Sequence, residues 1–313
     1  MKLQQLRYLC EVIRHRLNLS EAAESLHTSQ PGISKQIRLL EEELGVDVLV
    51  RHGKRVISVT EPGRQIVSVA ERILQDTENL KRIAGEFGAE DTGSLVIATT
   101  HTQARYALLP IISDFSRRYP KVRLSLRQGS QQQIAELVHA GDADIAITTE
   151  AAEWYQGLVL LPCYQWNRCV ITPPGHPLLK EKPLTLEAVA RYPIVTYDFA
   201  FTGHSPIKRA FDNKGITPNV VLTAIDAGVI KAYVEIGLGV GILAKMAVDP
   251  ARDTGLKMLD ASHLFEPSMT RIAVKPNAYL RGYVYDFIER FAPHLKRAVV
   301  DGTLRGKGTS YEL

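Results

Sequence analysis

The feature that most restricts the fold is a pair of amphipathic segments near the N-terminus that a two-residue break separates. The first follows Ser20 and reads EAAESLH, and the second begins after Thr28 or Ser29. Pro31 occupies the first turn of the second segment, where its missing N–H costs little. Apolar residues then recur at spacings of three and four up to Gly45, a predicted C-cap. Two helices joined this tightly are typical of a helix-turn-helix.

The flanking segments predict a winged form of this motif. Residues 4–15 have the apolar spacing of a further helix. Two strand-like pieces, 46–51 and 54–60, follow the pair and are joined by His52–Gly53. We therefore predict a winged helix-turn-helix domain over residues 1–59.

The outer face of the second segment is polar and suits the major groove of DNA. With Ile33, Ile37 and Leu40 turned inward, amide, hydroxyl and cationic side chains face out, and these groups hydrogen-bond to base edges or phosphates. The predicted DNA-binding residues are Ser29, Gln30, Pro31, Ser34, Lys35 and Arg38 from this helix, with Arg51 and Lys54 from the basic hairpin. A merely solvated polar face is the alternative for the helix alone. The acidic run Glu41–Glu42–Glu43 is expected in solvent on the same helix.

A long helix is expected over residues 60–88, with Thr60 as its cap and Pro62 in its first turn. Its apolar stripe consists of Ile66, Val69, Ala70, Ile73, Leu80, Ile83, Ala84 and Phe87. No neighbouring core in the sequence covers this stripe, which favours a coiled-coil-like dimer seam. Packing against its own domain is the alternative.

The character of the chain changes after the linker GAEDTGS, residues 88–94. Strand-like runs then alternate with amphipathic helices, which is typical of an α/β fold. The expected α/β organisation is a DNA-binding domain at 1–59, a linker helix at 60–88 and an effector-binding domain at 89–292. The effector-binding domain is expected to have one lobe at about 94–162 and 267–292 and a second at about 163–266. A basic, mobile tail is expected at 293–313.

The segment TTHTQ, residues 99–103, is a candidate ligand site. It lies where the predicted strand Leu95–Thr99 gives way to a helix, whose N-terminal N–H groups favour anions. Thr100, Thr102 and Gln103 add neutral donors, which suit a small oxyanion or a polar acylated amino acid. A capping cluster without any ligand is the alternative.

Other patterns argue against a catalytic or membrane role. The formal net charge of +4 is a weak signal, and no apolar run is long enough to span a bilayer. The nine histidines show no HxxxH spacing, and neither a zinc pattern nor a nucleophile elbow is present. The segment GLGVG follows a predicted helix, opposite to a dinucleotide fingerprint. We expect a cytoplasmic protein with three buried, reduced cysteines and no catalytic residue, metal or cofactor.

The segment SEAAESLHTSQPGISKQIRLLEEELGVDVLVR resembles the DNA-binding domain of LysR-type transcriptional regulators. GDADIAI, residues 141–147, and PPGHPL, residues 173–178, are also similar to that family. The resemblance implies a winged helix-turn-helix, a linker helix and a two-lobed effector domain like a type 2 periplasmic binding protein. It also implies promoter DNA and RNA polymerase as partners, with self-association into dimers or homotetramers.

Three segments are similar to the CysB-like branch of the family: residues 98–110, 164–168 and 199–203. The resemblance implies that Thr149, Trp166 and Thr202 line one cleft with the TTHTQ segment. It also implies regulation of sulfur assimilation and cysteine biosynthesis, with acetylserines, sulfate, thiosulfate or sulfide as candidate effectors. Control of sulfonate or sulfate-ester use, with a different effector, stays open. A solute-binding transport protein and an enzyme are more distant alternatives, because the chain has a DNA-binding block and no catalytic cluster.

Overall fold

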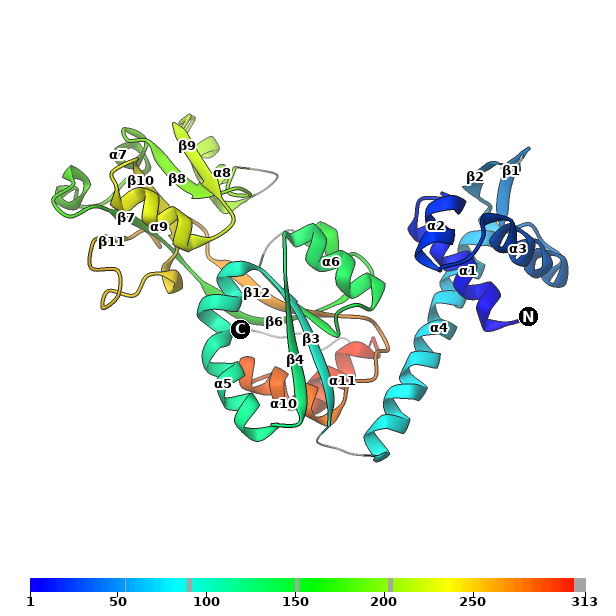
Figure 1. The fold of residues 1–313 in the computed structure, drawn as a ribbon. Helices are drawn as coiled ribbons and strands as arrows, with labels where there is room; N and C mark the ends of the chain where they lie inside the picture. The colour runs from blue at the N-terminus through cyan, green and yellow to red at the C-terminus, as the bar shows by residue number, and fades with distance from the viewer. Residues whose placement is uncertain (54, 89–91, 150–151, 202–204, 307–313) are drawn as a thin grey trace. The chain divides into compact units, whose positions relative to one another are not determined.

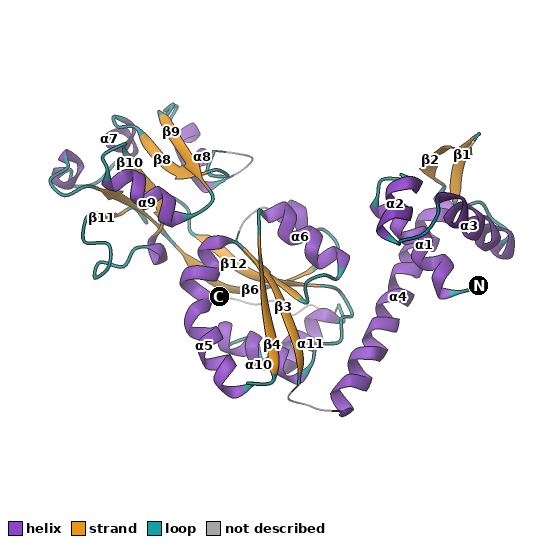
Figure 2. Cartoon of the chain, in the orientation of Figure 1, coloured by secondary structure: helices purple, strands orange, loops and turns teal. Residues whose placement is uncertain are grey.

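A computed structural model describes all residues except 54, 89–91, 150–151, 202–204 and 307–313. The chain divides into two compact units, Met1–Gly88 and Ala89–Leu313 (Figure 1). The first unit is helical with one small hairpin, and the second contains two β-sheets with helices on their faces (Figure 2).

The first unit is a winged helix-turn-helix, as the sequence predicts. Its elements are α1 (Leu3–Arg14), α2 (Leu19–Ser25), α3 (Gln30–Leu44), β1 (Leu49–His52), β2 (Arg55–Val59) and α4 (Glu61–Gly88). Leu9, Val12, Ile33, Ile37 and Leu40 are fully buried and form the centre of its core. Burial of each such side chain stabilises the fold by about 1.5–3 kcal/mol, which explains why the helical spacing of apolar residues predicts these elements.

The helix caps confirm most of the predicted boundaries. Ser29 accepts a hydrogen bond from the N–H of Gly32 at the start of α3, and Gly45 ends that helix in the left-handed region with φ 71°. The cap of α2 differs from the expectation. Asn18 accepts the N–H groups of Ser20 and Glu21, so Ser20 is a helical residue. Asparagine and serine cap equally well, and sequence alone did not separate them.

The apolar stripe of helix α4, which was expected to form a dimer seam, is partly covered by the first unit's own core. Ala70 is buried within the first unit, and Ile66 and Ile73 pack against the same core. This half of the helix therefore packs on its own domain. Two other residues of the stripe are exposed: Val69 in the first half, at 43%, and Leu80 further along, at 67%.

The first sheet of the second unit has the strand order β4-β3-β5-β12-β6. Its strands are β3 (Gly93–Thr99), β4 (Val122–Gln128), β5 (Ile145–Thr148), β6 (Val159–Trp166) and β12 (Ser268–Val274). Leu95 and Ile97 face a core shared with α5 (Leu108–Arg118) and α10 (Gly282–Phe291), whereas Ala98 packs with α6 (Gln131–Ala140). Helices therefore cover both faces, as the alternation of side chains along a strand requires.

The second sheet has the order β11-β7-β10-β8-β9. Its strands are β7 (Arg168–Thr172), β8 (Ile194–Tyr197), β9 (Val220–Ala224), β10 (Val240–Ala244) and β11 (Lys257–Asp260), with α7 (Leu186–Ala190), α8 (Pro206–Asn213) and α9 (Ala227–Glu235). The chain crosses between the sheets at Asn167 and returns before Ser268. Because β6 pairs with β12 through Trp166, the first lobe extends four residues beyond the expected boundary at 162.

The C-terminal segment differs from the mobile tail that was expected. Residues Arg297–Leu304 form helix α11, and Val300 and Leu304 are buried in the core of the first lobe. These two residues are one helical turn apart and lie on one face of the helix. The segment is therefore an amphipathic helix, although its basic composition suggested a mobile tail. Residues 307–313 of the expected tail lie outside the described part of the chain.

Candidate DNA-binding surface and effector site

Helix α3 presents its predicted DNA-binding residues on the surface of the first unit. Ser29, Gln30, Pro31, Lys35 and Arg38 are exposed, and Ser34 is half-buried. Neither Lys35 nor Arg38 forms an ion pair with any carboxylate among the described residues. Their charges therefore have no protein partner to exchange for a phosphate or a base.

Arg51, by contrast, is held by the fold. Its guanidinium lies 2.7 Å from the carboxylate of Glu41, and its side chain is only 19% exposed. The same carboxylate accepts the N–H groups of Val48 and Leu49, each at 2.9 Å. The expectation that Glu41 is solvated is therefore wrong. Its side chain is buried, and its hydrogen bonds tie α3 to the first strand of the wing. Lys54, the other predicted wing residue, lies outside the described part of the chain.

A hollow of about 800 Å³ extends the polar surface of α3. It is lined by residues 14–21, which run from the end of α1 to the first turn of α2, by Gln30 at the start of α3, and by Arg55 and Val56 in β2. Arg14 and Arg16 were not predicted to bind DNA. The sequence does not show that the segment with Arg14 and Arg16 lies beside β2 in the fold, so their place on one concave surface could not be predicted.

In the second unit, three predicted effector residues lie at the carboxyl ends of strands of the first sheet. Strands β3, β5 and β6 run in the same direction, because β3 is parallel to β5, and β12 is antiparallel to both β5 and β6. Thr100 follows β3, Thr149 follows β5 and Trp166 ends β6. Open α/β sheets bind ligands at the carboxyl ends of their strands, so this edge is a suitable site.

Gln103 and Thr149 already have partners inside the first lobe. The Gln103 amide accepts from the Tyr164 hydroxyl at 2.6 Å and donates to the Thr270 hydroxyl at 3.3 Å. The hydroxyl of Thr149 accepts from the amide of Gln131 at 3.3 Å. The structure therefore gives these two predicted residues a role in organising the sheet edge. Tyr164 belongs to the segment 164–168 that is similar to the CysB-like branch, but its partner could not be identified from sequence.

Thr100 and Thr102 lie at the start of the helical segment that leads into α5, as expected. The Thr100 hydroxyl accepts from the N–H of Gln103 at 3.4 Å, which is the capping role considered as an alternative. The Thr102 hydroxyl donates to the hydroxyl of Tyr197 at 3.3 Å, and Tyr197 ends β8 in the second lobe. Burial raises the pKa of Tyr197 to about 12, so this hydroxyl is neutral at physiological pH.

Trp166 has a buried donor that the fold does not use. Its indole Nε1 is inaccessible to solvent and has no hydrogen-bond partner among the described residues. The guanidinium of Arg168 lies 4.9 Å from the centre of the ring. Buried donors are normally satisfied by protein, water or ligand, and this indole N–H is an exception to that rule. Thr202 is outside the described residues.

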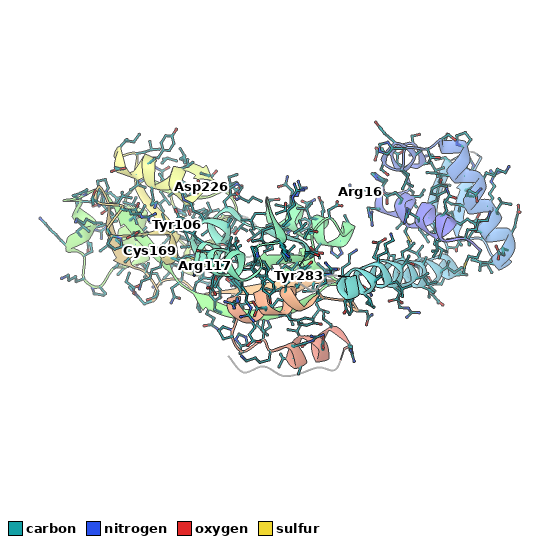
Figure 3. All side chains as sticks on the ribbon, turned by 60° about the horizontal axis from the view of Figure 1, so that its bottom comes forward. Arg16, Tyr106, Arg117, Cys169, Asp226 and Tyr283 are labelled. Carbon is teal, nitrogen blue, oxygen red and sulfur yellow. The ribbon has the colours of Figure 1, made fainter. Side chains whose placement is uncertain are left out.

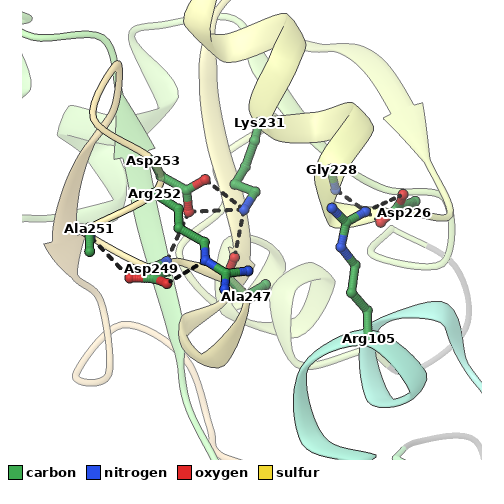
Figure 4. A network of polar contacts seen from close by, with 9 residues as sticks. All are labelled: Arg105, Asp226, Gly228, Lys231, Ala247, Asp249, Ala251, Arg252 and Asp253. Atoms are coloured by element: carbon green, nitrogen blue, oxygen red, sulfur yellow. Dashed lines mark hydrogen bonds and ion pairs between the residues drawn. The ribbon is translucent and has the colours of Figure 1, made fainter. Parts of the chain in front are cut away.

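A further set of contacts joins the two lobes beside Thr102. The helical turn Gln103–Ala107 is a π-helix, a geometry frequent at functional sites. Arg105 on this turn pairs at 3.7 Å with Asp226, which also caps α9 through the N–H of Gly228 (Figure 4). On α9, Lys231 bonds to Asp253 and places its ammonium 5.4 Å from the ring of Tyr106.

The remaining reactive groups do not form a catalytic arrangement within the described residues. The three cysteines are buried and free, and burial raises the pKa of each thiol to about 12. Such thiols carry almost no thiolate, the reactive form, at neutral pH. No group of three or more histidine, cysteine or acidic side chains in the described chain could hold a metal. Likewise, none of its helices is both long and apolar enough to cross a bilayer.

Comparison with protein families gives two matches that together cover most of the chain. Residues 3–64 match the family described as bacterial regulatory helix-turn-helix protein, lysR family. Residues 88–296 match the LysR substrate binding domain. The two matches correspond to the winged helix-turn-helix and to the two-sheet unit.

Similar proteins and structures agree with these matches. The transcriptional regulator SsuR of Burkholderia cenocepacia is 54% identical, covering 97% of this chain and 99% of its own. The regulator CysB of the same organism is 52% identical over the full length of both chains. The crystal structure of the cofactor-binding domain of the Cbl transcriptional regulator matches 68% of this chain and 93% of its own, with 39% identity and a TM-score of 0.65.

Proposed function

The chain belongs to the LysR family of DNA-binding transcriptional regulators, and we propose that it controls genes of sulfur assimilation and cysteine biosynthesis. In this proposal, α3 binds promoter DNA and the edge of the first sheet binds a small sulfur-status metabolite. The observation that carries the proposal is whole-chain similarity, above 50% identity, to regulators named CysB and SsuR. The proposal assigns the chain no catalytic activity, metal or cofactor, and places it in the cytoplasm.

On the DNA, we assign base and phosphate contacts to exposed residues of α3 and the hairpin. Gln30 suits adenine, and Lys35 and Arg38 suit guanine or phosphate. Further DNA contacts are assigned to Ser29, Pro31, Ser34 and Lys54. Arg51 acts mainly through Glu41, by fixing the hairpin on α3.

For the effector, we assign direct contacts to Thr100, Thr102, Trp166 and Thr202, with Gln103 and Thr149 shaping the site. The indole N–H of Trp166 supplies a neutral donor for an oxyanion or an acetyl group, and the Thr102 hydroxyl exchanges its bond to Tyr197 for one to the ligand. Acetylserine, sulfate and thiosulfate all fit this chemistry. A ligand that bridges Thr102 and the second lobe would favour one lobe arrangement over another, which is what a regulatory response requires.

Self-association and polymerase contact complete the proposal. The stretch of α4 around Leu80, which is exposed, is the proposed dimer seam, and two such dimers would form the homotetramer. A dimer holds two recognition helices at a fixed spacing on the operator. RNA polymerase is the proposed partner at the promoter.

A second function is favoured by the near-equal identities of the two regulators. The identities of this chain to SsuR and CysB differ by only two percentage points and do not separate the two possibilities, so control of sulfonate or sulfate-ester use stays the alternative. Fluorescence anisotropy of the full chain on promoter fragments from cysteine-biosynthesis and sulfonate-use operons tests both. Effector-dependent binding to the first set supports the main proposal, and binding confined to the second supports the alternative. Equal affinity for both promoter sets and for random DNA would contradict both proposals.

A further inference from the structure

We propose that the hollow between the α1–α2 loop and the wing seats the sugar-phosphate backbone of DNA, with Arg16 and Arg55 as its phosphate-binding residues. This inference rests on the proposed DNA binding by α3 and adds a second contact surface beside it. Figure 3 marks Arg16 within the helical unit.

The lining of the hollow has the right charge. Arg14, Arg16 and Arg55 contribute three cations, and Glu21 contributes one anion. The Glu21 carboxylate is already engaged, since it accepts from Asn18 at 2.6 Å and lies 3.6 Å from His15. A net positive concave surface attracts a polyanion.

Two of the three arginines are available for a ligand. Arg14 pairs with Glu11 at 2.9 Å and is therefore already compensated. Arg16 and Arg55 are exposed and have no ion-pair partner among the described residues. Arginine binds phosphate through two parallel N–H bonds, which suits this pair of free guanidinium groups.

The backbone of the loop supports a dedicated role for Arg16. Arg16 and Leu17 have φ angles of 50° and 69°, a conformation that glycine adopts without cost. Leu17 packs against the core, which explains why a side chain is retained there. Arg16 is exposed and gains no comparable packing. A constrained backbone that presents an unpaired cation is a preorganised contact.

Hydrogen bonds hold this loop in place. The N–H of Leu17 donates to the carbonyl of Val12 at 2.8 Å, and the N–H of Asn18 donates to His15 at 2.9 Å. Leu19, just beyond, is buried. The backbone at Arg16 is therefore held in place before any ligand binds, which lowers the backbone entropy lost on binding.

Continuity with α3 favours DNA over a small anion. Gln30, the first residue of the recognition helix, lines the same hollow. A ligand in contact with Arg16 would therefore lie next to a helix whose N-terminal residues face the bases. The hollow has room for several phosphodiester groups, whereas one inorganic anion would fill a small part of its 800 Å³.

The test measures how DNA affinity depends on salt. The full chain, Arg16→Asn, Arg55→Gln and the double variant are titrated onto a 30-base-pair random duplex and a promoter duplex at several KCl concentrations. Each lost phosphate contact should reduce the slope of log K against log salt by about 0.9. Asparagine tolerates the backbone of Arg16, and Arg16→Lys should retain most of the slope.

Matched controls separate the possible outcomes. Arg7→Ala removes an exposed arginine that does not line the hollow, and it should leave the slope unchanged. The Arg16 and Arg55 variants should weaken binding to both duplexes equally, because phosphates carry no sequence information. Unchanged slopes in folded Arg16 and Arg55 variants would overturn the inference and leave DNA binding by α3 intact. Failure of the unmodified chain to bind either duplex would remove the proposed function itself.

Discussion

The outer face of α3 and the carboxyl edge of the first sheet are both rich in polar side chains, yet they differ in what those side chains already bind. On α3, Lys35 and Arg38 have no ion-pair partner among the described residues. At the sheet edge, Gln103 is completely buried and bonded to Tyr164 and Thr270. The cationic side chains of α3 therefore depend on a partner molecule for their ion pairs, whereas the polar side chains at the sheet edge are already hydrogen-bonded within the protein. Substitutions should therefore affect binding in one region and folding in the other.

The largest change in unfolding free energy should come from Glu41, a residue of α3 that is buried against the wing and does not belong to the exposed polar face. Glu41→Ala leaves Arg51 and two backbone N–H groups without their acceptor, and losing one member of a buried ion pair costs about 3–5 kcal/mol. Denaturant unfolding of the first unit measures this change. Glu42→Ala, at an exposed neighbour, is the control and should change stability by less than about 0.5 kcal/mol. Equal effects of the two variants would show that Glu41 is not structural.

A somewhat smaller effect is expected at the sheet edge. Gln103→Leu leaves the buried Thr270 hydroxyl and the partly buried Tyr164 hydroxyl without this partner, at an expected cost of about 2–3 kcal/mol. Calorimetric unfolding of the full chain should show a lower midpoint for the two-sheet unit only. Gln132→Leu, on the exposed side of α6, should leave that midpoint unchanged. An unaltered midpoint in Gln103→Leu would mean that the sheet edge is not preassembled.

Substitution on the exposed polar face of α3 should lower DNA affinity and leave the unfolding free energy unchanged. Arg38→Ala should weaken promoter binding by about 1–3 kcal/mol if Arg38 reads a base, without a change in unfolding free energy. Anisotropy on promoter and random duplexes separates base reading from phosphate contact. Arg72→Ala, at an exposed position on α4, serves as the charge-matched control. Loss of stability in Arg38→Ala would break the distinction between the two regions.

The ion pair between the lobes should have the smallest effect. Arg105 is 61% exposed and Asp226 is 27% exposed, and such pairs contribute about 0–1 kcal/mol. A double-mutant cycle with Arg105→Gln and Asp226→Asn measures the coupling in thermal unfolding. Coupling above about 1.5 kcal/mol would place this pair among the preassembled contacts of the sheet edge.

The same comparison explains what the sequence could predict. The free face of α3 follows from periodicity, because exposed and buried positions alternate with the helical repeat and need no knowledge of distant residues. The carboxyl-edge position of Thr100 and Thr149 follows from the strand pattern. Glu41 could not be distinguished from Glu42 by sequence, since the difference lies in its contact with the wing.

The remaining differences also depend on tertiary contacts. The partners of Gln103 are 61 and 167 residues away in the chain, and no local pattern identifies them. Helix α4 carries an apolar stripe that is interrupted at Thr77, but only contact with the first unit's core shows which part of it is covered. In the C-terminal segment, basic residues suggested a mobile tail, whereas Val300 and Leu304 fold its helix onto the first lobe.

The central claim is that the sheet edge binds a sulfur metabolite through Thr102, and calorimetry on the full chain tests it most directly. The ligands are N-acetylserine, O-acetylserine, sulfate, thiosulfate and a sulfonate. Tyr197→Phe, which disrupts the contact between the lobes but keeps the Thr102 hydroxyl, and Thr102→Ser are the controls. At least one ligand should bind the unmodified chain. It should bind Thr102→Ala about 10- to 100-fold more weakly, since a hydrogen bond to a charged group contributes about 1.5–3 kcal/mol. Equal affinity of Thr102→Ala and the unmodified chain for every ligand, or no binding by either, would contradict the claim.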